Sequence, residues 1–212
     1  TKRIMPHGSG HANCHEDPSF VVIAIVSEVL PSSHMFVRSA ARYGYTIRFG
    51  YLNRSRTFVS ARMAKQLELL QVTCEHTVVM VTDAYDVFFH RPASLALARF
   101  LETNRSMVWS VERIYGNQDP ADQPFYEAGR PHVETNGTNT SSPYAFINTG
   151  GFMGYAGILA RMVSTALSVR PGAAGWHNKT CGEAHGRVCA DMWIYGHTMA
   201  HTWNRFDAAF DY

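Results

Sequence analysis

The chain has 212 residues, 46% of them hydrophobic and 17% charged, which suits one globular α/β domain with a sizeable core. A formal net charge of +2 without any lysine- or arginine-rich block gives no indication of binding to nucleic acid or to an anionic membrane. The apolar run FVVIAIV at residues 20–26 stops far short of the roughly 20 residues of a membrane span. We therefore expect no membrane-spanning segment.

The N-terminal residues resemble neither a signal peptide nor a folded element. Residues 1–19 are polar, contain glycine and histidine, and lack the apolar stretch of a secretory leader. We expect a loose N-terminal segment over residues 1–19 and a single α/β domain over residues 20–212.

Sequons and cysteines together indicate the compartment. Chance rarely places five Asn-x-Ser/Thr sequons in polar segments of so short a chain, so they favour a glycosylated protein of the secretory pathway, in the lumen of the endoplasmic reticulum or Golgi or outside the cell. The sequons are at Asn53, Asn104, Asn136, Asn139 and Asn178.

Four cysteines permit two disulfides in an oxidising compartment. They are Cys14, Cys74, Cys181 and Cys189. Cys181 and Cys189 enclose a short loop and are the preferred pair. A zinc site is the competing interpretation, but the sequence has no Cys-x-x-Cys spacing.

Strand-like and helix-like segments alternate along the first half of the chain. Apolar β-branched runs predict the strands, and apolar residues at helical spacing predict the helices between them. This alternation is typical of a parallel sheet with helical crossovers. The strands are expected at 20–27, 45–52, 76–83 and 106–112, and the helices at 31–44, 57–72 and 92–104.

The second half has a less regular pattern. Residues 113–143 are rich in Pro, Gly, Asn and Thr and contain no convincing element, so this stretch is expected to be functional or disordered. Residues 144–156 are expected to form a strand that runs into a Gly-rich turn, and residues 157–169 a helix. A loop bounded by cysteines then leads to residues 190–200.

Two carboxylates follow the expected buried strand VVMVT. In an open parallel sheet the ligand crevice lies beyond the carboxyl ends of the strands, which is where Asp83 and Asp86 fall. Two such carboxylates can converge on one hard cation that bridges phosphates, and Tyr85 between them can present its ring to a base or ribose. The alternative is that Asp83 caps a turn and Asp86 lies on the surface.

A second polar group occurs in INTGGFMGYA. Asn148 offers an amide donor and acceptor suited to sugar hydroxyls, and Gly150, Gly151 and Gly154 allow close approach of backbone to substrate. The spacing matches neither the dinucleotide-binding fingerprint nor the phosphate-binding loop. Plain turn chemistry is the competing interpretation.

The ordered motifs resemble those of one family. VVMVTDAYDVFF, MVWSVE, FINTGGFMGYA and CADMWIY, with the earlier IAIVSE, are similar to the glycosyltransferase domain of the procollagen lysyl hydroxylases and related hydroxylysine-directed glycosyltransferases. The resemblance covers roughly residues 20–196. It implies a GT-A-type, Rossmann-like fold, with a mostly parallel twisted sheet flanked by helices, that binds a UDP-sugar.

The same resemblance implies roles for individual residues. Asp83 and Asp86 would hold Mn²⁺. Ser27, Glu28 and Tyr85 would contact the nucleotide. The transferred sugar would lie near Glu112, Asn148, Gly150 and Gly151. Asp191 would lie on the acceptor side, where a carboxylate can orient a hydroxyl or stabilise a sugar cation.

The chain also departs from the family pattern. Only Asp191 remains where the family has several consecutive aspartates, and the family's third metal ligand is a histidine in an H-G-N-G motif that the sequence to Tyr212 lacks. A domain that is truncated at its C-terminus is therefore one of the options that stay open. His197 and His201 have the i, i+4 spacing of a ligand pair, but we interpret them as ordinary polar residues.

Two classes of function follow. One is a Mn²⁺-dependent transfer of glucose or galactose from a UDP-sugar to a protein or glycan hydroxyl, with a collagen-like acceptor as one option. The other is an inactive glycosyltransferase-like module with a binding or structural role in an extracellular assembly. A nucleotide-sugar hydrolase or pyrophosphorylase is a third option, which explains the five sequons poorly.

Overall fold

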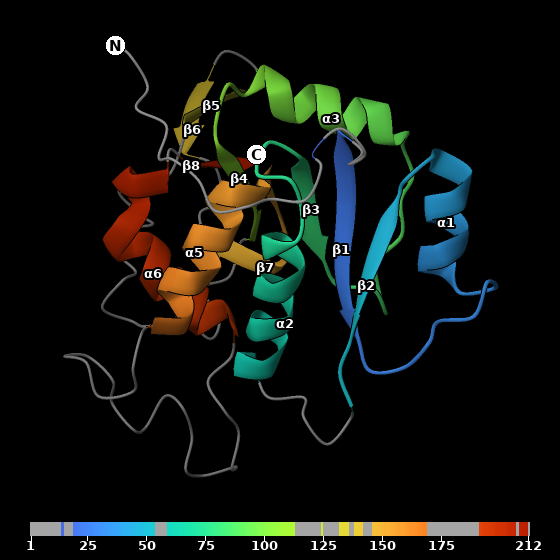
Figure 1. Cartoon of the computed structure of the whole chain (residues 1–212). Coiled ribbons are helices and arrows are strands. Elements are labelled where there is room, and N and C mark those ends of the chain that lie inside the picture. Colours follow the sequence, from blue (N-terminus) through green and yellow to red (C-terminus); the bar gives the residue numbers. More distant parts are fainter. Residues whose placement is uncertain are drawn as a thin grey trace, which may run out of the picture.

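We describe the fold from a computed structural model of the chain, which describes residues 14, 19–53, 59–112, 124, 132–135, 138–141, 146–168, 191–206 and 208–211. Its centre is a six-stranded sheet with strand order β2-β1-β3-β7-β4-β8 (Figure 1). The strands are β1 (Phe20–Val26), β2 (Ile47–Tyr51), β3 (Val78–Thr82), β4 (Met107–Glu112), β7 (Phe146–Tyr155) and β8 (Ala208–Asp211).

One strand of the sheet runs against the others. β1 pairs in parallel with β2 and β3, and β4 pairs in parallel with β8. β7 lies between β3 and β4 and is antiparallel to both. The mostly parallel α/β sheet expected of a GT-A-type domain is therefore confirmed.

Helices cover both faces of the sheet (Figure 1). One face packs against α2, α5 and α6, and the other against α1 and α3. The helices are α1 (Met35–Tyr43), α2 (Val59–Gln71), α3 (Ala93–Glu102), α5 (Ala156–Ser168) and α6 (Asp191–Phe206).

The sequence of β1 explains why the strand is buried on both faces. Val21, Ile23 and Ile25 face the helix layer of α2, α5 and α6, while Val22 and Ala24 face α1. All seven residues of the strand are buried. A strand covered on both faces has a continuous apolar run instead of an alternating pattern, and each large apolar side chain buried there stabilises the fold by about 1.5–3 kcal/mol.

The elements expected within residues 20–112 are present, with ends that differ by a few residues. Two expectations for the second half are wrong. The Gly-rich turn within residues 144–156 is instead part of β7, which continues through all three glycines. Residues 113–143 contain a hairpin of β5 (His132–Thr135) and β6 (Thr138–Ser141), whose polar residues gave no strand pattern.

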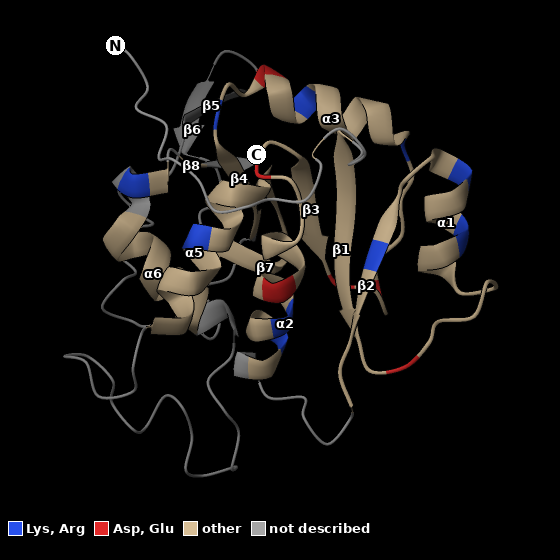
Figure 2. Ribbon diagram, viewed as in Figure 1, with Lys and Arg blue, Asp and Glu red and all other residues tan. Residues whose placement is uncertain are grey.

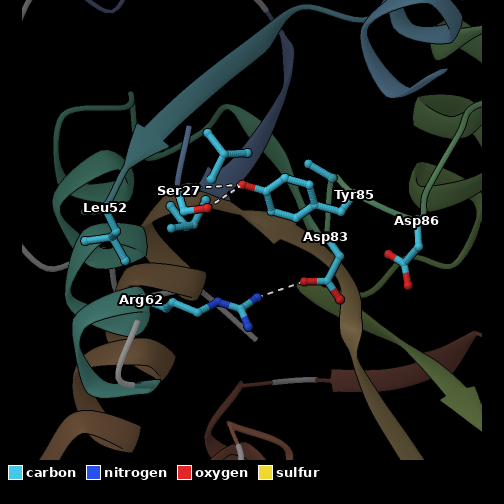
Figure 3. Close-up of a pocket in the computed structure, with 9 residues that line it drawn as sticks. Ser27, Leu52, Arg62, Asp83, Tyr85 and Asp86 are labelled. Carbon is cyan, nitrogen blue, oxygen red and sulfur yellow. Dashed lines mark hydrogen bonds and ion pairs between the residues drawn. The ribbon is translucent and has the colours of Figure 1, made fainter. Parts of the chain in front are cut away.

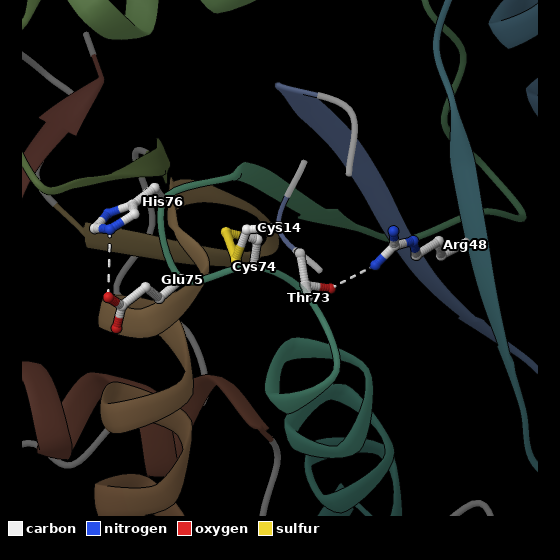
Figure 4. The surroundings of a disulfide bond; sticks show 6 residues. All are labelled: Cys14, Arg48, Thr73, Cys74, Glu75 and His76. Carbon is white, nitrogen blue, oxygen red and sulfur yellow. Dashed lines mark hydrogen bonds and ion pairs between the residues drawn. A yellow bond between two sulfur atoms is a disulfide. The ribbon is translucent and has the colours of Figure 1, made fainter. Parts of the chain in front are cut away.

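A disulfide ties the N-terminal segment to the domain. Cys14 is bonded to Cys74, which lies in the connection between α2 and β3 (Figure 4). Nearby, Arg48 donates a hydrogen bond to Thr73 at 2.8 Å. The expected pair of Cys181 and Cys189 lies outside the described residues, as does most of the 1–19 segment.

Two of the five sequon asparagines can be placed as exposed residues. Asn53 follows β2, and Asn104 lies after α3 with a positive φ of 50°, a conformation that asparagine adopts more readily than most residues. Asn139 belongs to β6, while Asn136 and Asn178 are outside the described residues.

Charged residues are scattered over the described elements and do not gather on one face (Figure 2), in keeping with the small net charge. Within the described ranges, none of the helices has the length and apolarity needed to cross a membrane.

Candidate functional site

A cavity of about 460 Å³ lies beyond the carboxyl ends of the first three strands (Figure 3). Ile25, Val26 and Ser27 come from the end of β1, Leu52 follows β2, and residues 83–86 follow β3. Arg62 of α2 also lines the cavity. The cavity therefore occupies the position where open α/β sheets bind their ligands.

Asp83 places its carboxylate in this cavity. Its Oδ1 accepts a hydrogen bond from the Arg62 guanidinium at 2.8 Å, in an ion pair whose side chains are 40% and 33% exposed. Its backbone N–H donates to the Gly150 carbonyl at 3.1 Å, which fixes the start of the loop after β3. Asp86 is exposed and lines the same cavity.

Tyr85 connects the loops after β1 and β3. Its hydroxyl accepts a hydrogen bond from the Ser27 backbone N–H at 2.8 Å and lies 2.8 Å from Ser27 Oγ. Tyr85 is 46% exposed, and its ring contacts His34 edge to face, with the ring centroids 6.4 Å apart. Glu28 follows Ser27 and is exposed, but it is not among the described residues that line the cavity.

Beside Asp83, β7 forms a wide bulge against β4. Trp109 is opposite Phe152 and Val111 is opposite Ile147, so residues 148–151 of β7 face Ser110 alone. The Ser110 Oγ lies 3.0 Å from the Asn148 carbonyl and 2.6 Å from the Gly151 carbonyl. The single hydroxyl proton of Ser110 can be donated to either of these carbonyls or shared between them, and Gly151 is the closer acceptor.

The bulge comes close to the carboxylate of Asp83 at Gly150, which has no side chain. The Asn148 Oδ1 accepts a hydrogen bond from the Gly150 N–H at 2.7 Å, and the Gly150 carbonyl accepts one from Thr82 Oγ1 at 3.1 Å. A Cβ at Gly150 would lie 2.9 Å from Asn148 Oδ1 and 3.1 Å from Asp83 Oδ2. Glycine at 150 therefore fits this close approach of two side-chain oxygens, while a larger residue would make one of them shift.

The remaining predicted residues are described only by their backbone. Glu112 is the last residue of β4, and Asp191 is the first residue of α6. Their side chains lie outside the described part of the chain. Their predicted roles near the sugar and the acceptor stay predictions.

The cavity offers oxygen ligands of the kind that a hard divalent cation prefers. Asp83 and Asp86 offer carboxylate oxygens, the ligand type that Mn²⁺ and Mg²⁺ prefer, and an incoming diphosphate and water could supply the rest. Within the described residues no group of three His, Cys, Asp or Glu side chains could hold a metal ion. His197 and His201 have ring centroids 4.2 Å apart on α6 without a third such partner there.

Sequence reasoning missed two residues of the site. Arg62 had a detectable signal, because it is a basic residue near the start of a helix whose preceding strand ends at the crevice. Ser110 is the one hydroxyl in the strand MVWSVE, but its contacts depend on a strand pairing that the sequence does not reveal.

The family model described as PLOD GT domain matches residues 16–169, and the chain belongs to this family of glycosyltransferase domains. The matched range contains Ser27, Asp83, Asp86 and Asn148 but not Asp191. The expected resemblance is therefore confirmed, and the acceptor-side residue Asp191 falls outside the matched part.

A curated relative supports the same assignment. Mouse (Mus musculus) procollagen-lysine,2-oxoglutarate 5-dioxygenase 2 is 24% identical over 157 residues, covering 68% of this chain. The chain covers only 19% of the length of that relative.

Solved structures give weaker likenesses. The 4-diphosphocytidyl-2C-methyl-D-erythritol synthase of Anaerococcus prevotii aligns over 92% of this chain and 90% of its own, with 10% identity and a TM-score of 0.41. Another structure of a synthase of this name aligns over 68% and 78%, with 13% identity and a TM-score of 0.29. Both TM-scores are below 0.5.

Proposed function

We propose that the chain is a metal-dependent glycosyltransferase that transfers a hexose, glucose or galactose, from a UDP-sugar to a protein or glycan hydroxyl. The observation that carries this proposal is the cavity at the carboxyl ends of β1 and β3, where Asp83, Asp86, Ser27 and Tyr85 meet within the part of the chain that the family model matches. A cavity of about 460 Å³ also has the size of a small-molecule site.

Asp83 and Asp86 are the proposed holders of Mn²⁺. When bound, the ion would neutralise the diphosphate as it departs. Ser27, Glu28 and Tyr85 are the proposed nucleotide contacts. The hydroxyl of Tyr85 bonds Ser27 at the cavity wall, and the exposed part of the residue can contact uridine.

In the proposed reaction the bond between the anomeric carbon and the β-phosphate oxygen breaks. The acceptor oxygen forms the new bond to that carbon and loses its proton, and UDP leaves. Asn148 is proposed to bind sugar hydroxyls, because the Gly150 N–H orients its amide. The proposed sugar and acceptor contacts further include Gly150, Gly151, Glu112 and Asp191.

The proposed setting is the lumen of the secretory pathway or the extracellular space. The Cys14–Cys74 disulfide supports an oxidising compartment, and the five sequons favour the same route. A protein acceptor, collagen-like in the first instance, is proposed because the mouse relative is by name a procollagen-lysine enzyme.

The alternative function is an inactive glycosyltransferase-like module with a binding or structural role. It is favoured by the single acidic residue Asp191, where the resembling family has several.

Release of UDP from UDP-glucose and from UDP-galactose distinguishes the two functions. We expect the purified chain to release UDP with Mn²⁺ and to lose this activity in EDTA and in the variant Asp83→Asn. Binding of UDP without release from either donor, with and without collagen peptides as acceptors, would favour the inactive module.

A further inference from the structure

Arg62 is the one cation among the described residues that line the cavity, and two carboxylates, Asp83 and Asp86, line it as well. It extends from α2 into the cavity and reaches Asp83 Oδ1 at 2.8 Å (Figure 3). A guanidinium therefore neutralises the carboxylate to which we assign the metal.

We infer that Arg62 exchanges partners during substrate binding: it is the counter-ion of Asp83 in the empty site and binds the diphosphate of the donor in the filled site. This inference rests on the proposed function. Arg62 thereby becomes a further residue that binds the donor.

The chemistry of the cavity supports the exchange. A divalent cation on Asp83 would repel a guanidinium at hydrogen-bond distance, while a diphosphate brings negative charge into the same cavity. A guanidinium binds carboxylate and phosphate with the same planar set of donors, so the side chain can change partner by rotation. The side chains of Arg62 and Asp83 are also partly exposed, at 33% and 40%, so separating this ion pair costs little free energy.

The exchange predicts opposite effects of one substitution on two ligands. Without Arg62, Mn²⁺ no longer competes with a guanidinium for Asp83. The affinity of Mn²⁺ for the nucleotide-free chain therefore rises. The affinity for UDP at saturating Mn²⁺ falls, because a charge-assisted contact is lost. A general folding defect would instead lower the affinity for both ligands.

The test is calorimetric titration of the purified chain, first with Mn²⁺ alone and then with UDP at saturating Mn²⁺. For Arg62→Gln we expect Mn²⁺ to bind about three- to tenfold more tightly, since a screened like charge is removed. We expect UDP to bind about tenfold more weakly. Arg62→Lys should restore most of the UDP affinity.

Lys65→Gln is the matched control, because Lys65 lies one turn further along α2, pairs with Glu68 and does not line the cavity. It makes the same change in net charge and should alter neither affinity. If the glutamine variant does not fold, both titrations are repeated with Arg62→Ala, because alanine has a high helix propensity.

The outcomes separate the inference from the proposed function. In one outcome the unaltered chain binds UDP while the Arg62 variants have Mn²⁺ and UDP affinities that are unchanged or both reduced. This result would overturn the inference and leave the proposed function standing. An unaltered chain that binds no UDP at saturating Mn²⁺ would overturn the proposed function and the inference with it.

Discussion

At the residue scale, the hydroxyl of Tyr85 is expected to contribute to the stability of the fold, and its ring to the binding of UDP. It links two loops that are 58 residues apart in the sequence, and the ring beside it is partly exposed. Tyr85→Phe removes the hydrogen bonds to Ser27 and keeps the ring. We expect a loss of about 0.5–1.5 kcal/mol in the free energy of unfolding, measured by chemical denaturation, with UDP affinity largely kept.

Tyr85→Ala is the comparison that tests the ring itself. It removes the proposed surface for the uridine, so UDP should bind about tenfold more weakly than to Tyr85→Phe, because stacking on a base contributes roughly 1–3 kcal/mol. Equal UDP affinities of the two variants would show that the ring does not contact the base.

Single residues also show how far sequence reasoning reaches. Asp83, Tyr85 and Asp86 follow a predicted strand, whereas Ser27 is implied by the family resemblance at the end of another, and the structure brings all four to one cavity. Strand ends meet at one edge of a parallel sheet, so their proximity follows from local patterns. Arg62 comes from a helix, and its reach to Asp83 depends on how that helix packs.

At the element scale, the bulge of β7 is the feature that shapes the site, and Ser110 holds it. Ser110→Ala leaves the Asn148 and Gly151 carbonyls without this donor. We expect the free energy of unfolding to fall by about 1–2 kcal/mol, with a parallel loss of affinity for UDP in Mn²⁺. Thr165→Ala is the control, because its hydroxyl bonds the Arg161 carbonyl on an exposed face of α5.

A Cβ at Gly150 tests the close approach of β7 to Asp83. In Gly150→Ala the added carbon would meet Asn148 Oδ1 and Asp83 Oδ2, so one of them must move. We expect a loss of about 1–3 kcal/mol in stability and weaker binding of Mn²⁺, measured by titration. Gly151→Ala, whose Cβ meets Ser110 Oγ at 3.3 Å, should cost less; the reverse order of the two variants would contradict the geometry.

The elements that sequence reasoning misjudged depend on distant pairing. Glycines suggest a turn when read locally, but residue 154 lies in β7, and it is a glycine because a Cβ there would meet Met107 Cβ and the Ser106 carbonyl at 2.8 Å. The insertion of β7 between β3 and β4 joins segments about 70 residues apart, which no local period records. The hairpin of β5 and β6 was missed because its strands are short and polar.

At the scale of the whole molecule, the Cys14–Cys74 disulfide and the cavity lie at opposite ends of β3. The disulfide joins the chain next to Thr73, before the strand, while Asp83 follows it. Replacing both cysteines by serine should lower the free energy of unfolding by about 2–4 kcal/mol, as judged by denaturation. UDP affinity at saturating Mn²⁺ should remain within about twofold; a large loss would contradict this separation.

The overall architecture was the most predictable level, since β1 and β3 are continuous apolar runs and the helices between them are amphipathic. The order of strands and the antiparallel direction of β7 were not predictable. Both depend on pairing between segments that are far apart in the sequence.

The most direct test of the proposed site is calorimetric titration of UDP into the chain in Mn²⁺ and in EDTA, beside Asp83→Asn and the exposed control Glu102→Gln on α3. We predict binding in the range of about 1 μM to 1 mM for the unaltered chain and the control in Mn²⁺, and none in EDTA or with Asp83→Asn. Equal binding in EDTA, or by Asp83→Asn, would contradict a metal-dependent nucleotide site at the end of β3.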